Sequence, residues 1–413
     1  MTSSALPGSN HQSEVLDFTR TRRQEQLREE YCAAGRKLVR GTAAARDAGQ
    51  TFERSLWRQV AETGLFGLHL PEPFGGRGWS IAETAAAFEG FAEGCEDTGF
   101  LVSLVSHVGL VATVLHVFGT ETQQRRWLPG LIDGSLIGCF AITEKDCGSD
   151  VRAMELAAHP DGGGGWRLAG GKWCITNAPV ADVAITFARL HGRAGRPVCA
   201  FIADLHQPGL TKSAPLDLMG NRTTPVGELV FSDYPAAAGT LMGAAGRGLR
   251  VLEFAFIVER ILTGIGIAGC LETLISLCLV RTRQRRAFGR PIGDYQHVQE
   301  HVVEMAAGRE LVRSAAWRAL HALARGEDCS LLASVVKLTA AEVFHKAATA
   351  ALRIHGNHGY RRGGTIERFC RDSAGILLAG GTSEVHKTII WRRLQRPRRH
   401  NPEPSPHETK SPH

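Results

Sequence analysis

A glutamate inside an apolar helical stretch, Glu259 in FIVERILTGIG (256–266), is the residue of this sequence best suited to proton transfer. At 3.6 residues per turn, the face around it is mostly apolar and consists of Leu252, Ala255, Phe256, Leu262 and Thr263. Burial there disfavours the charged form, so we expect the pKa of this carboxyl to rise toward that of a general base. The alternative is a structural salt bridge with a buried arginine of a neighbouring helix. Arg260, about 100° away on the helix, is expected to be a structural or interface residue.

Three glycines, Gly264, Gly266 and Gly269, spell a GxGxxG pattern. Such a pattern cradles a dinucleotide pyrophosphate where a strand precedes it and a helix follows. Here the preceding residues, VLEFAFIVERILT, have a helical pattern, and no βαβ unit surrounds them. We therefore predict that these glycines allow two helices to pack closely.

Four further segments combine hydroxyl, charged and glycine residues, and the first two, taken alone, are polar turns beside strands. The segments are AITEKDCGSD (141–150), KWCITNAPVADV (172–183), RRAFGRPIGDYQHVQ (285–299) and IHGNHGYRRGGTIERFCRDSAGILLAGGTSE (354–384).

The elements that must position these segments follow a helix, strand, helix order. Residues 15–135 have helical periodicity, broken by a proline- and glycine-rich loop at 69–78. Residues 136–245 contain short runs that predict strands of an antiparallel barrel or sandwich: VAITFARL, VCAFIADL and GELVFSD. Helical patterns return in 246–395, with long segments around 249–285, 294–323, 328–356 and 382–394. Because the strands do not alternate with helices, a doubly wound parallel sheet is disfavoured.

Composition excludes several classes of protein. With 413 residues, 43% of them hydrophobic, the chain can bury a large core without disulfides or metal. Much of the net charge of +7 comes from arginines near the C-terminus (392–399). No motif that would bind in a groove of DNA or RNA accompanies them, so we expect no nucleic-acid partner. The ten cysteines occur singly and form no CxxC pair, which predicts free thiols in the cytoplasm and no metal centre. No export signal is visible, and residues 1–14 and 396–413 are expected to be flexible ends.

Two apolar segments, 100–119 and 261–280, are long enough to cross a membrane. The first contains histidines and serines that hydrocarbon disfavours, and neither has the flanking signature of a span. We therefore predict helices of a buried core and no membrane association.

Together, in this order and spacing, the four segments resemble the acyl-CoA dehydrogenase family of flavoproteins. PEPFGGRG (71–78) and FGTETQQRRWLPGLIDGSLIG (118–138) extend the resemblance to residues 50–394. It implies a mainly α fold with a central β domain: an N-terminal helical domain, a middle β domain and a C-terminal four-helix bundle. It also implies FAD, a homotetramer, an electron-transferring flavoprotein as partner, and dehydrogenation of an acyl thioester borne by coenzyme A or an acyl carrier protein.

The family's motifs imply two groups of cofactor-binding residues. The group at the flavin ring and pyrophosphate consists of Phe140, Ile142, Thr143, Ser149, Cys174 and Thr176. The group at the diphosphate and adenosine, reached across a subunit interface, consists of Arg285, Phe288, Gln296, Arg353, Gly356 and Asn357, with Thr382 and Glu384 at the other end of the bundle. Cys174 stands where an aromatic ring is usual, one position from Trp173. Lys145, Arg353 and Asn357 replace a usual proline, glutamine and glycine.

The family's usual base precedes the Gly-Thr of the last motif, where this chain has Gly380, which cannot accept a proton. The isovaleryl-CoA dehydrogenase branch carries its glutamate just before an arginine on the first helix of the C-terminal domain, and Glu259-Arg260 matches that pattern. The resemblance thus implies Glu259 as the base and a short or branched acyl group. Two alternatives stay open: a flavin-dependent monooxygenase on the same fold, and a non-enzymatic binding protein retaining the fold.

Overall fold

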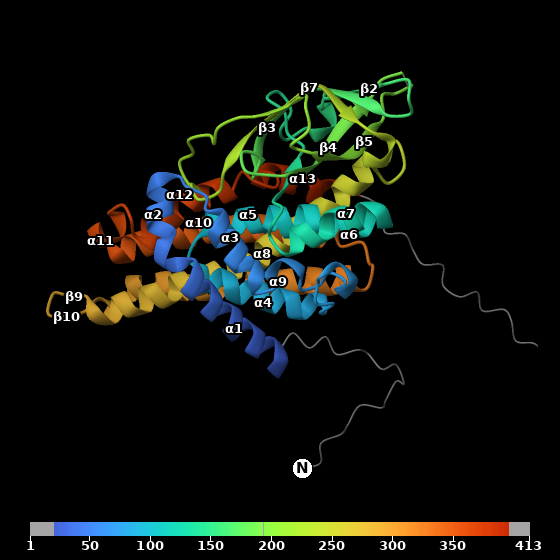
Figure 1. Cartoon of the computed structure of the whole chain (residues 1–413). Helices are drawn as coiled ribbons and strands as arrows, with labels where there is room; N and C mark the ends of the chain where they lie inside the picture. Colours follow the sequence, from blue (N-terminus) through green and yellow to red (C-terminus); the bar gives the residue numbers. More distant parts are fainter. Residues whose placement is uncertain (1–19, 193, 396–413) are drawn as a thin grey trace, which may run out of the picture.

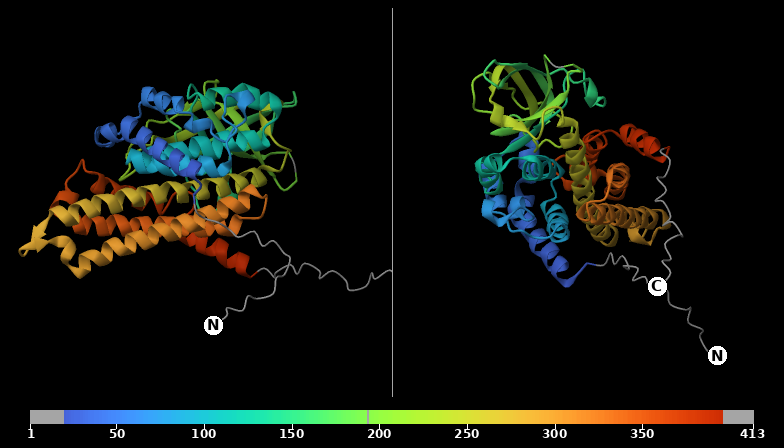
Figure 2. Two further views of the ribbon diagram at one scale, coloured as in Figure 1. Left: turned by 90° about the horizontal axis from the view of Figure 1, so that it is seen from below. Right: turned by 90° about the vertical axis from the view of Figure 1, so that its right-hand side faces the viewer.

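The computed structural model describes residues 20–192 and 194–395, so the ends expected to be flexible, 1–14 and 396–413, lie outside the described residues. A β domain lies along one side of two groups of helices (Figure 1). Seen end-on, the N-terminal helices and the C-terminal bundle lie side by side beneath the β domain (Figure 2). The predicted fold class, mainly α with a central β domain, is confirmed.

Four of the seven α-helices described in the N-terminal domain begin at side-chain caps that the sequence provides. The seven are α1 (Arg22–Leu38), α2 (Ala43–Gly49), α3 (Arg54–Glu62), α4 (Ile81–Cys95), α5 (Thr98–Leu104), α6 (Thr113–Phe118) and α7 (Glu121–Ile132). The capped helices are α1, α4, α5 and α7. Capping boxes start α4 at Ser80 with Glu83 and α7 at Thr120 with Gln123. A π-helix, η4 (Val105–Ala112), joins α5 to α6, so the chain stays helical from Thr98 to Phe118.

The middle domain is a mixed, open sheet. Its strands are β1 (Gly138–Ala141), β2 (Ala157–Pro160), β3 (Trp166–Thr176), β4 (Val183–Leu190), β5 (Val198–Asp204), β6 (Leu210–Lys212), β7 (Val226–Ala236) and β8 (Leu241–Met242). Most pairs are antiparallel, but β4 runs parallel to β1 and to β2, and no pairing between described strands closes the sheet into a barrel. The expectation of a wholly antiparallel barrel or sandwich is corrected here. Long crossovers, rather than hairpins, lead from β1 and β2 to β4 and allow parallel pairing.

The C-terminal bundle contains the four predicted long segments. They are α8 (Gly248–Gln284), α9 (Gln296–Ala324), α10 (Ser330–His355) and α13 (Ser383–Leu394). A small hairpin, β9 (Arg286–Ala287) with β10 (Arg290–Pro291), lies between α8 and α9, and α11 (Asn357–Tyr360) and α12 (Thr365–Ile376) follow α10. Helices α8, α9 and α10 pack on one another, and α12 and α13 pack on α10.

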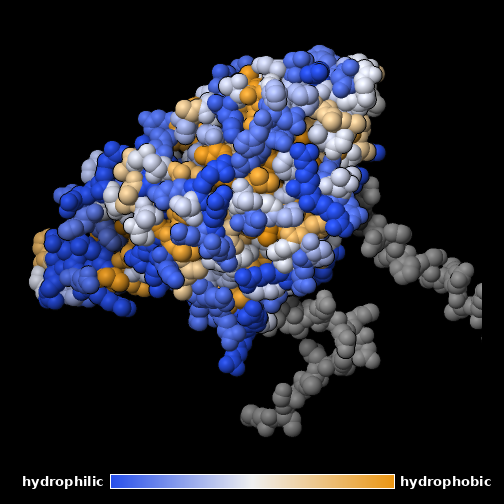
Figure 3. All heavy atoms as spheres, viewed as in Figure 1, coloured by the Kyte–Doolittle hydropathy of each residue, from blue (hydrophilic) through white to orange (hydrophobic). Residues whose placement is uncertain are grey.

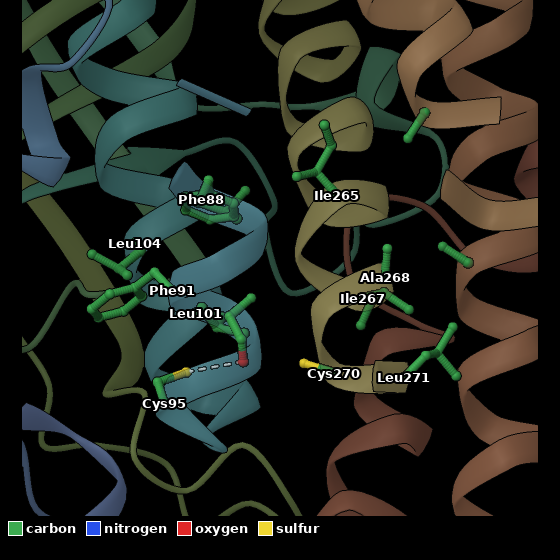
Figure 4. Packing of buried hydrophobic residues seen from close by; sticks show 14 of the residues in the cluster. Phe88, Phe91, Cys95, Leu101, Leu104, Ile265, Ile267, Ala268, Cys270 and Leu271 are labelled. Carbon is green, nitrogen blue, oxygen red and sulfur yellow. Dashed lines mark hydrogen bonds between the residues drawn. The ribbon is translucent and has the colours of Figure 1, made fainter. Parts of the chain in front are cut away.

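The GxGxxG glycines lie inside α8 and permit close helix contacts, as predicted. A Cβ at Gly269 would lie 2.4 Å from the Glu89 carbonyl oxygen of α4, and one at Gly264 only 2.2 Å from Cγ1 of Val336 in α10. Figure 4 shows the contact between α4 and α8, where Phe88 faces Ile265 across the interface. The dinucleotide-binding interpretation of this pattern is thereby excluded.

One hydrophobic core joins the two helical domains. It includes Leu27 and Phe91 from the N-terminal helices, Leu271 from α8, and Phe344 and Phe369 from the C-terminal bundle. Separate clusters pack on the two faces of the β sheet. The helices Thr98–Phe118 and Gly248–Gln284 are long and apolar enough to span a membrane, but 72% of the most apolar stretch of each is buried, as in core helices.

Candidate active site

The Glu259 carboxylate lies directly in front of Gly380. A Cβ built on Gly380 would lie 2.3 Å from Oε1 and 2.6 Å from Oε2 of Glu259. Gly380 has φ +65°, a conformation that suits glycine, and it lies in the segment between α12 and α13. The structure thus brings the predicted base, Glu259, next to Gly380, the residue at the family's usual base position, although the two are 121 positions apart (259 to 380).

The Glu259 carboxylate is buried, and only one of its two oxygens has a hydrogen-bond partner among the described residues. Its Oε1 accepts a 3.3 Å hydrogen bond from the Thr263 hydroxyl one helical turn away, and Oε2 has no hydrogen-bond partner in the described part of the chain. Burial raises the pKa of Glu259, although the nearby Lys337 and Arg260 cations oppose this rise. The geometry is that of a carboxylate with one oxygen held and the other free to take a proton.

The expected alternative, a structural salt bridge of Glu259, is not formed among the described residues. The Arg260 guanidinium lies over the Phe256 ring, with its carbon 5.1 Å from the centroid, and a long 3.4 Å hydrogen bond joins Nη1 to the Ser334 hydroxyl of α10. Arg260 is buried, which agrees with the structural role predicted for it.

Two further buried groups lie at this site. Lys337 of α10 is buried, and burial lowers its pKa to about 8 while Glu259 opposes the change. His386 of α13 is also buried, and both ring nitrogens lack partners among the described residues. Burial, followed by the Arg260 and Lys337 cations, lowers the pKa of His386 to about 3, so its ring is neutral. A Cβ at Gly381 would lie 3.1 Å from its Nε2.

The segment after β1 and the middle of β3 form one surface. The Trp173 N–H donates to the Thr143 carbonyl at 2.8 Å, and the Thr143 hydroxyl donates back to the Trp173 carbonyl. Cys174 has φ +56° at an irregularity of the β3–β7 pairing, and its side chain is exposed, whereas Trp173 is half-buried beneath Lys145. Ile142 and Thr143 therefore lie next to Trp173 and Cys174, and Thr176 lies two residues after Cys174 on the same strand.

Lys172 fixes this surface from inside the β domain. Its buried ammonium donates to the Ile142 carbonyl at 2.9 Å and to Glu144 Oε1 at 2.8 Å. Glu144 also accepts the backbone N–H groups of Glu155 and Leu156. Partial burial opposes ionisation of Glu144, but the Lys172 ammonium outweighs it and lowers the pKa of this carboxyl. Sequence reasoning missed Lys172, although a lysine within the apolar alternation of β3 was a visible signal.

Two of the residues predicted to lie at the flavin ring and pyrophosphate, Phe140 and Ser149, are placed differently from the residues of the surface formed by Thr143 and Cys174. The Phe140 side chain is buried in the sheet core against Phe187, with ring centroids 5.2 Å apart, so only its backbone could face a ligand. Ser149 is exposed two residues after a tight turn, in which Glu144 and Cys147 exchange backbone hydrogen bonds.

A second site lies near the end of the bundle that carries β9 and β10. Arg285, Phe288, Arg353, Gly356 and Asn357 line a cavity of about 550 Å³ there. Arg281, His355 and His358 also line it and were missed, because each reads as an ordinary polar residue of a helix. This end of the molecule presents hydrophilic residues mixed with apolar ones (Figure 3). Five basic side chains around one cavity form a donor set for a diphosphate.

Three predicted residues do not line this cavity. Gln296 is exposed at the start of α9, between the lining residues Tyr295 and Val298. Thr382 caps α13 by accepting the Val385 N–H at 3.3 Å, and Glu384 follows it in the first turn. Both belong instead to the neighbourhood of Gly380.

The two sites are far apart within one chain. Glu259 and Arg285 are separated by 26 residues (259 to 285) along α8, or ~39 Å at 1.5 Å per residue. The structure therefore does not bring all the predicted cofactor-binding residues into one site of one chain.

Comparisons with known proteins agree with this architecture. Family models described as the acyl-CoA dehydrogenase N-terminal, middle and C-terminal domains match residues 21–135, 139–234 and 246–395. L-prolyl-[peptidyl-carrier protein] dehydrogenase of Pseudomonas fluorescens is 32% identical over 354 residues, covering 86% of this chain and 93% of that protein. Mitochondrial isovaleryl-CoA dehydrogenase of Oryza sativa is 30% identical, with 90% and 91% covered. The solved structure of PigA with FAD and proline has a TM-score of 0.88 at 27% identity, covering 92% of this chain and 99% of that one.

Proposed function

Because the chain belongs to the acyl-CoA dehydrogenase family of FAD-dependent oxidoreductases, which dehydrogenate acyl thioesters, we propose that Glu259 is the base that removes the α-proton of a short or branched acyl thioester. The observation that carries this proposal is the position of the Glu259 carboxylate, 2.3 Å from where a Cβ of Gly380 would lie. The proposal covers thioesters of coenzyme A and of a carrier protein, since both present the same phosphopantetheine arm.

The residues of both sites fit FAD. The cavity lined by Arg281, Arg285 and Arg353 offers cationic donors for the diphosphate, and the Cys174 side chain is exposed on the surface that it forms with Thr143. When bound, FAD supplies the oxidant, which accepts the β-hydrogen together with two electrons.

The chain's own residues handle the proton. Thr263 holds Oε1 of Glu259, so the unpartnered Oε2 is the atom that takes the α-proton. Burial raises the pKa of the carboxyl, which makes it a stronger base than a carboxylate in water. Lys172 holds the segment carrying Ile142 and Thr143 in place through its bond to the Ile142 carbonyl.

The test is anaerobic titration of the FAD-loaded protein with saturated acyl thioesters of coenzyme A and of a carrier protein. Bleaching of the oxidised flavin spectrum, with formation of the α,β-unsaturated thioester, is expected. Absence of bleaching with every thioester would overturn the proposal. Hydroxylated product from reduced flavin and oxygen would then favour the monooxygenase alternative, and the absence of any turnover would favour a binding protein.

We infer a limit on the size of the acyl group from the packing of α8 against η4 next to Glu259. A Cβ at Gly109 of η4 would lie 2.8 Å from Leu262 Cδ1 and 3.5 Å from Val258 Cγ1, so these two side chains already fill the contact between α8 and η4. Leu262 lies one turn after Glu259. We infer that little room is left there for a long straight chain.

Replacing Leu262 by alanine should therefore shift selectivity toward longer acyl chains. One methylene in an apolar pocket is worth about tenfold or more in specificity, and this change removes three carbons. We expect the ratio of kcat/KM for a longer over a shorter straight-chain thioester to rise by about tenfold or more. Leu249→Ala, on the same helix but in the core cluster beneath the sheet, is the control. An unchanged ratio in a folded Leu262→Ala enzyme would contradict this inference.

The phosphate role of Arg285 is tested by Arg285→Ala. Loss of a charge-assisted partner of a diphosphate is worth ~1.5–3 kcal/mol, so the Kd for FAD should rise about tenfold to a hundredfold. The measurement is FAD retention by the holoenzyme during dialysis. Arg286→Ala is the matched control, because Arg286 is exposed and donates to the Gly289 carbonyl at 2.6 Å. Equal retention by both variants would remove Arg285 from the site.

We also propose that the chain forms a homotetramer and acts in the cytoplasm, with an electron-transferring flavoprotein as electron acceptor. The ~39 Å between Glu259 and Arg285 supports cofactor sites shared between copies, with Arg285 serving the flavin site of a partner chain. Apolar contacts for a second copy are offered by three exposed side chains, Val303, Leu311 and Leu378. No disulfide joins any of the cysteines, all of which lie among the described residues, and this suits a reducing compartment. Sedimentation analysis of the FAD-loaded protein tests the assembly.

A further inference from the structure

We propose that Lys337 is a positioning residue for the base: it keeps the Glu259 carboxylate ionised and holds the segment containing Gly380 against it. This inference rests on the proposed function in that Glu259 is the base. Lys337 comes from a different helix, α10, and belongs to none of the segments that the family resemblance identified.

The contacts of Lys337 connect it to the loop beneath Glu259. Its side chain is 1% exposed, and its ammonium donates a 2.7 Å hydrogen bond to the carbonyl of Ile376, the last residue of α12. Gly380 follows Ile376 by four positions. The bond therefore satisfies a terminal carbonyl of α12 and fixes the start of the segment that passes in front of Glu259.

Besides this hydrogen bond, the Lys337 ammonium acts on Glu259 through its positive charge. An ammonium has three N–H donors, and the bond to Ile376 uses one of them. The Lys337 ammonium is the cation that most lowers the pKa of Glu259. In turn, the Glu259 carboxylate raises the pKa of Lys337 and so favours the charged form of the lysine. Two buried opposite charges stabilise each other in this way only while both are ionised.

The other groups facing Glu259 cannot take over this role. Arg260, on the same helix, lies over Phe256 and reaches toward Ser334. His386 of α13 is neutral, because its pKa is lowered to about 3 by burial and by the Arg260 and Lys337 cations. On the side of η4, the residue packed against α8 is Gly109, which has no charge. Thr263, which donates to Glu259, is a hydroxyl and is also uncharged. Lys337 is thus the cation on which the charge of the base depends most.

This arrangement has a defined pH dependence. The base is active as a carboxylate, so its activity is lost as the pH falls through the pKa of Glu259. The Lys337 ammonium lowers that pKa, and removing it must move the loss to higher pH. Above about pH 8, Lys337 itself loses its proton. The effect of removing it should therefore shrink at alkaline pH.

The first measurement is the ionisation of Glu259 without substrate. Infrared difference spectra of the substrate-free holoenzyme, with Glu259→Gln as the subtraction reference, should show a carboxylate in the parent at pH 7. In Lys337→Gln and Lys337→Met they should show a protonated carboxyl, and in Lys337→Arg a carboxylate. A Glu259 carboxylate in Lys337→Gln and Lys337→Met at pH 7 would overturn the proposal.

The second measurement is the pH profile of flavin reduction by a saturating thioester. Lys337→Met should be about tenfold slower than the parent at pH 6 but within about threefold of it at pH 9. Lys346→Met, on the exposed side of α10 where Lys346 pairs with Glu304, should follow the parent at every pH. A uniform loss at all pH values would show that Lys337 only caps α12. If Lys337→Met does not fold, Lys337→Gln, which keeps an N–H donor for Ile376, gives the same test.

The two possible failures are distinguishable. If Glu259→Gln reduces flavin at the parental rate, the base assignment fails, yet the infrared spectra still report whether Lys337 controls the charge of Glu259. If Glu259→Gln is slow but the spectra of the Lys337 variants match the parent, the base stands and the role of Lys337 falls.

Discussion

Replacing Glu259 by glutamine should slow flavin reduction by ~10²–10⁴-fold while leaving the fold and FAD binding intact. Glutamine keeps the shape of the side chain and can still accept the Thr263 hydroxyl at its amide oxygen, but it cannot take a proton at Oε2. The measurement is stopped-flow bleaching of the flavin by a saturating thioester under anaerobic conditions.

The control for this change is Glu253→Gln, because Glu253 is an exposed glutamate of the same helix. It should reduce flavin at the parental rate. A parental rate in Glu259→Gln as well would make Glu259 structural, and the assignment of the base would fail together with the likeness to the isovaleryl branch.

Replacing Gly380 by alanine should lower the rate of flavin reduction by ~10²-fold, the scale on which misplacement by about an ångström acts. The new methyl would lie 2.3 Å from Oε1 of Glu259, closer than any contact allows, so the carboxylate must move. The residue would also retain φ +65°, which strains any side chain by ~1–3 kcal/mol. Rates are compared at equal FAD content.

Gly363→Ala separates the two effects. Gly363 has φ +91°, but a Cβ there meets nothing within 4 Å, so this variant carries the backbone strain without the collision. It should lose stability and keep its rate. Equal rate losses in both variants would mean that the position of Glu259 is not the cause.

The same geometry allows the base to be moved from α8 to the segment between α12 and α13. Because the Cβ direction at Gly380 points at the Glu259 carboxylate, a glutamate at 380 can place its own carboxylate there once the space is cleared. Glu259→Ala with Gly380→Glu should therefore reduce flavin faster than Glu259→Ala alone. Glutamine at 259 would fill that space, so alanine is the better partner for this exchange.

Much of the architecture could be predicted because its signals are local. The run VAITFARL predicted β4, which spans Val183–Leu190, and the pattern around Glu259 predicted both the helix and the burial of the carboxyl. The glycines of α8 were interpreted correctly because their helical context is also a local property.

The features that could not be predicted depend on residues distant in the chain. The parallel pairing of β4 with β1 follows from a crossover of about forty residues rather than from the strands themselves. Lys337 looks like any lysine of a helix, and its burial is decided by the end of α12, 39 positions later. The left-handed backbone of Cys174 arises from a β3–β7 irregularity, for which a cysteine gives no signal.

The core shared by the two helical domains has a consequence for how the chain reaches its native state. During synthesis, Phe88 and Phe91 of α4 emerge well before Ile265 and Leu271 of α8, against which this core is built (Figure 4). Until α8 has left the ribosome, the N-terminal helices expose apolar surface that they cannot cover among themselves. We therefore expect the nascent chain to bind chaperones until α8 has been translated, and an N-terminal fragment that ends before α8 should aggregate rather than fold.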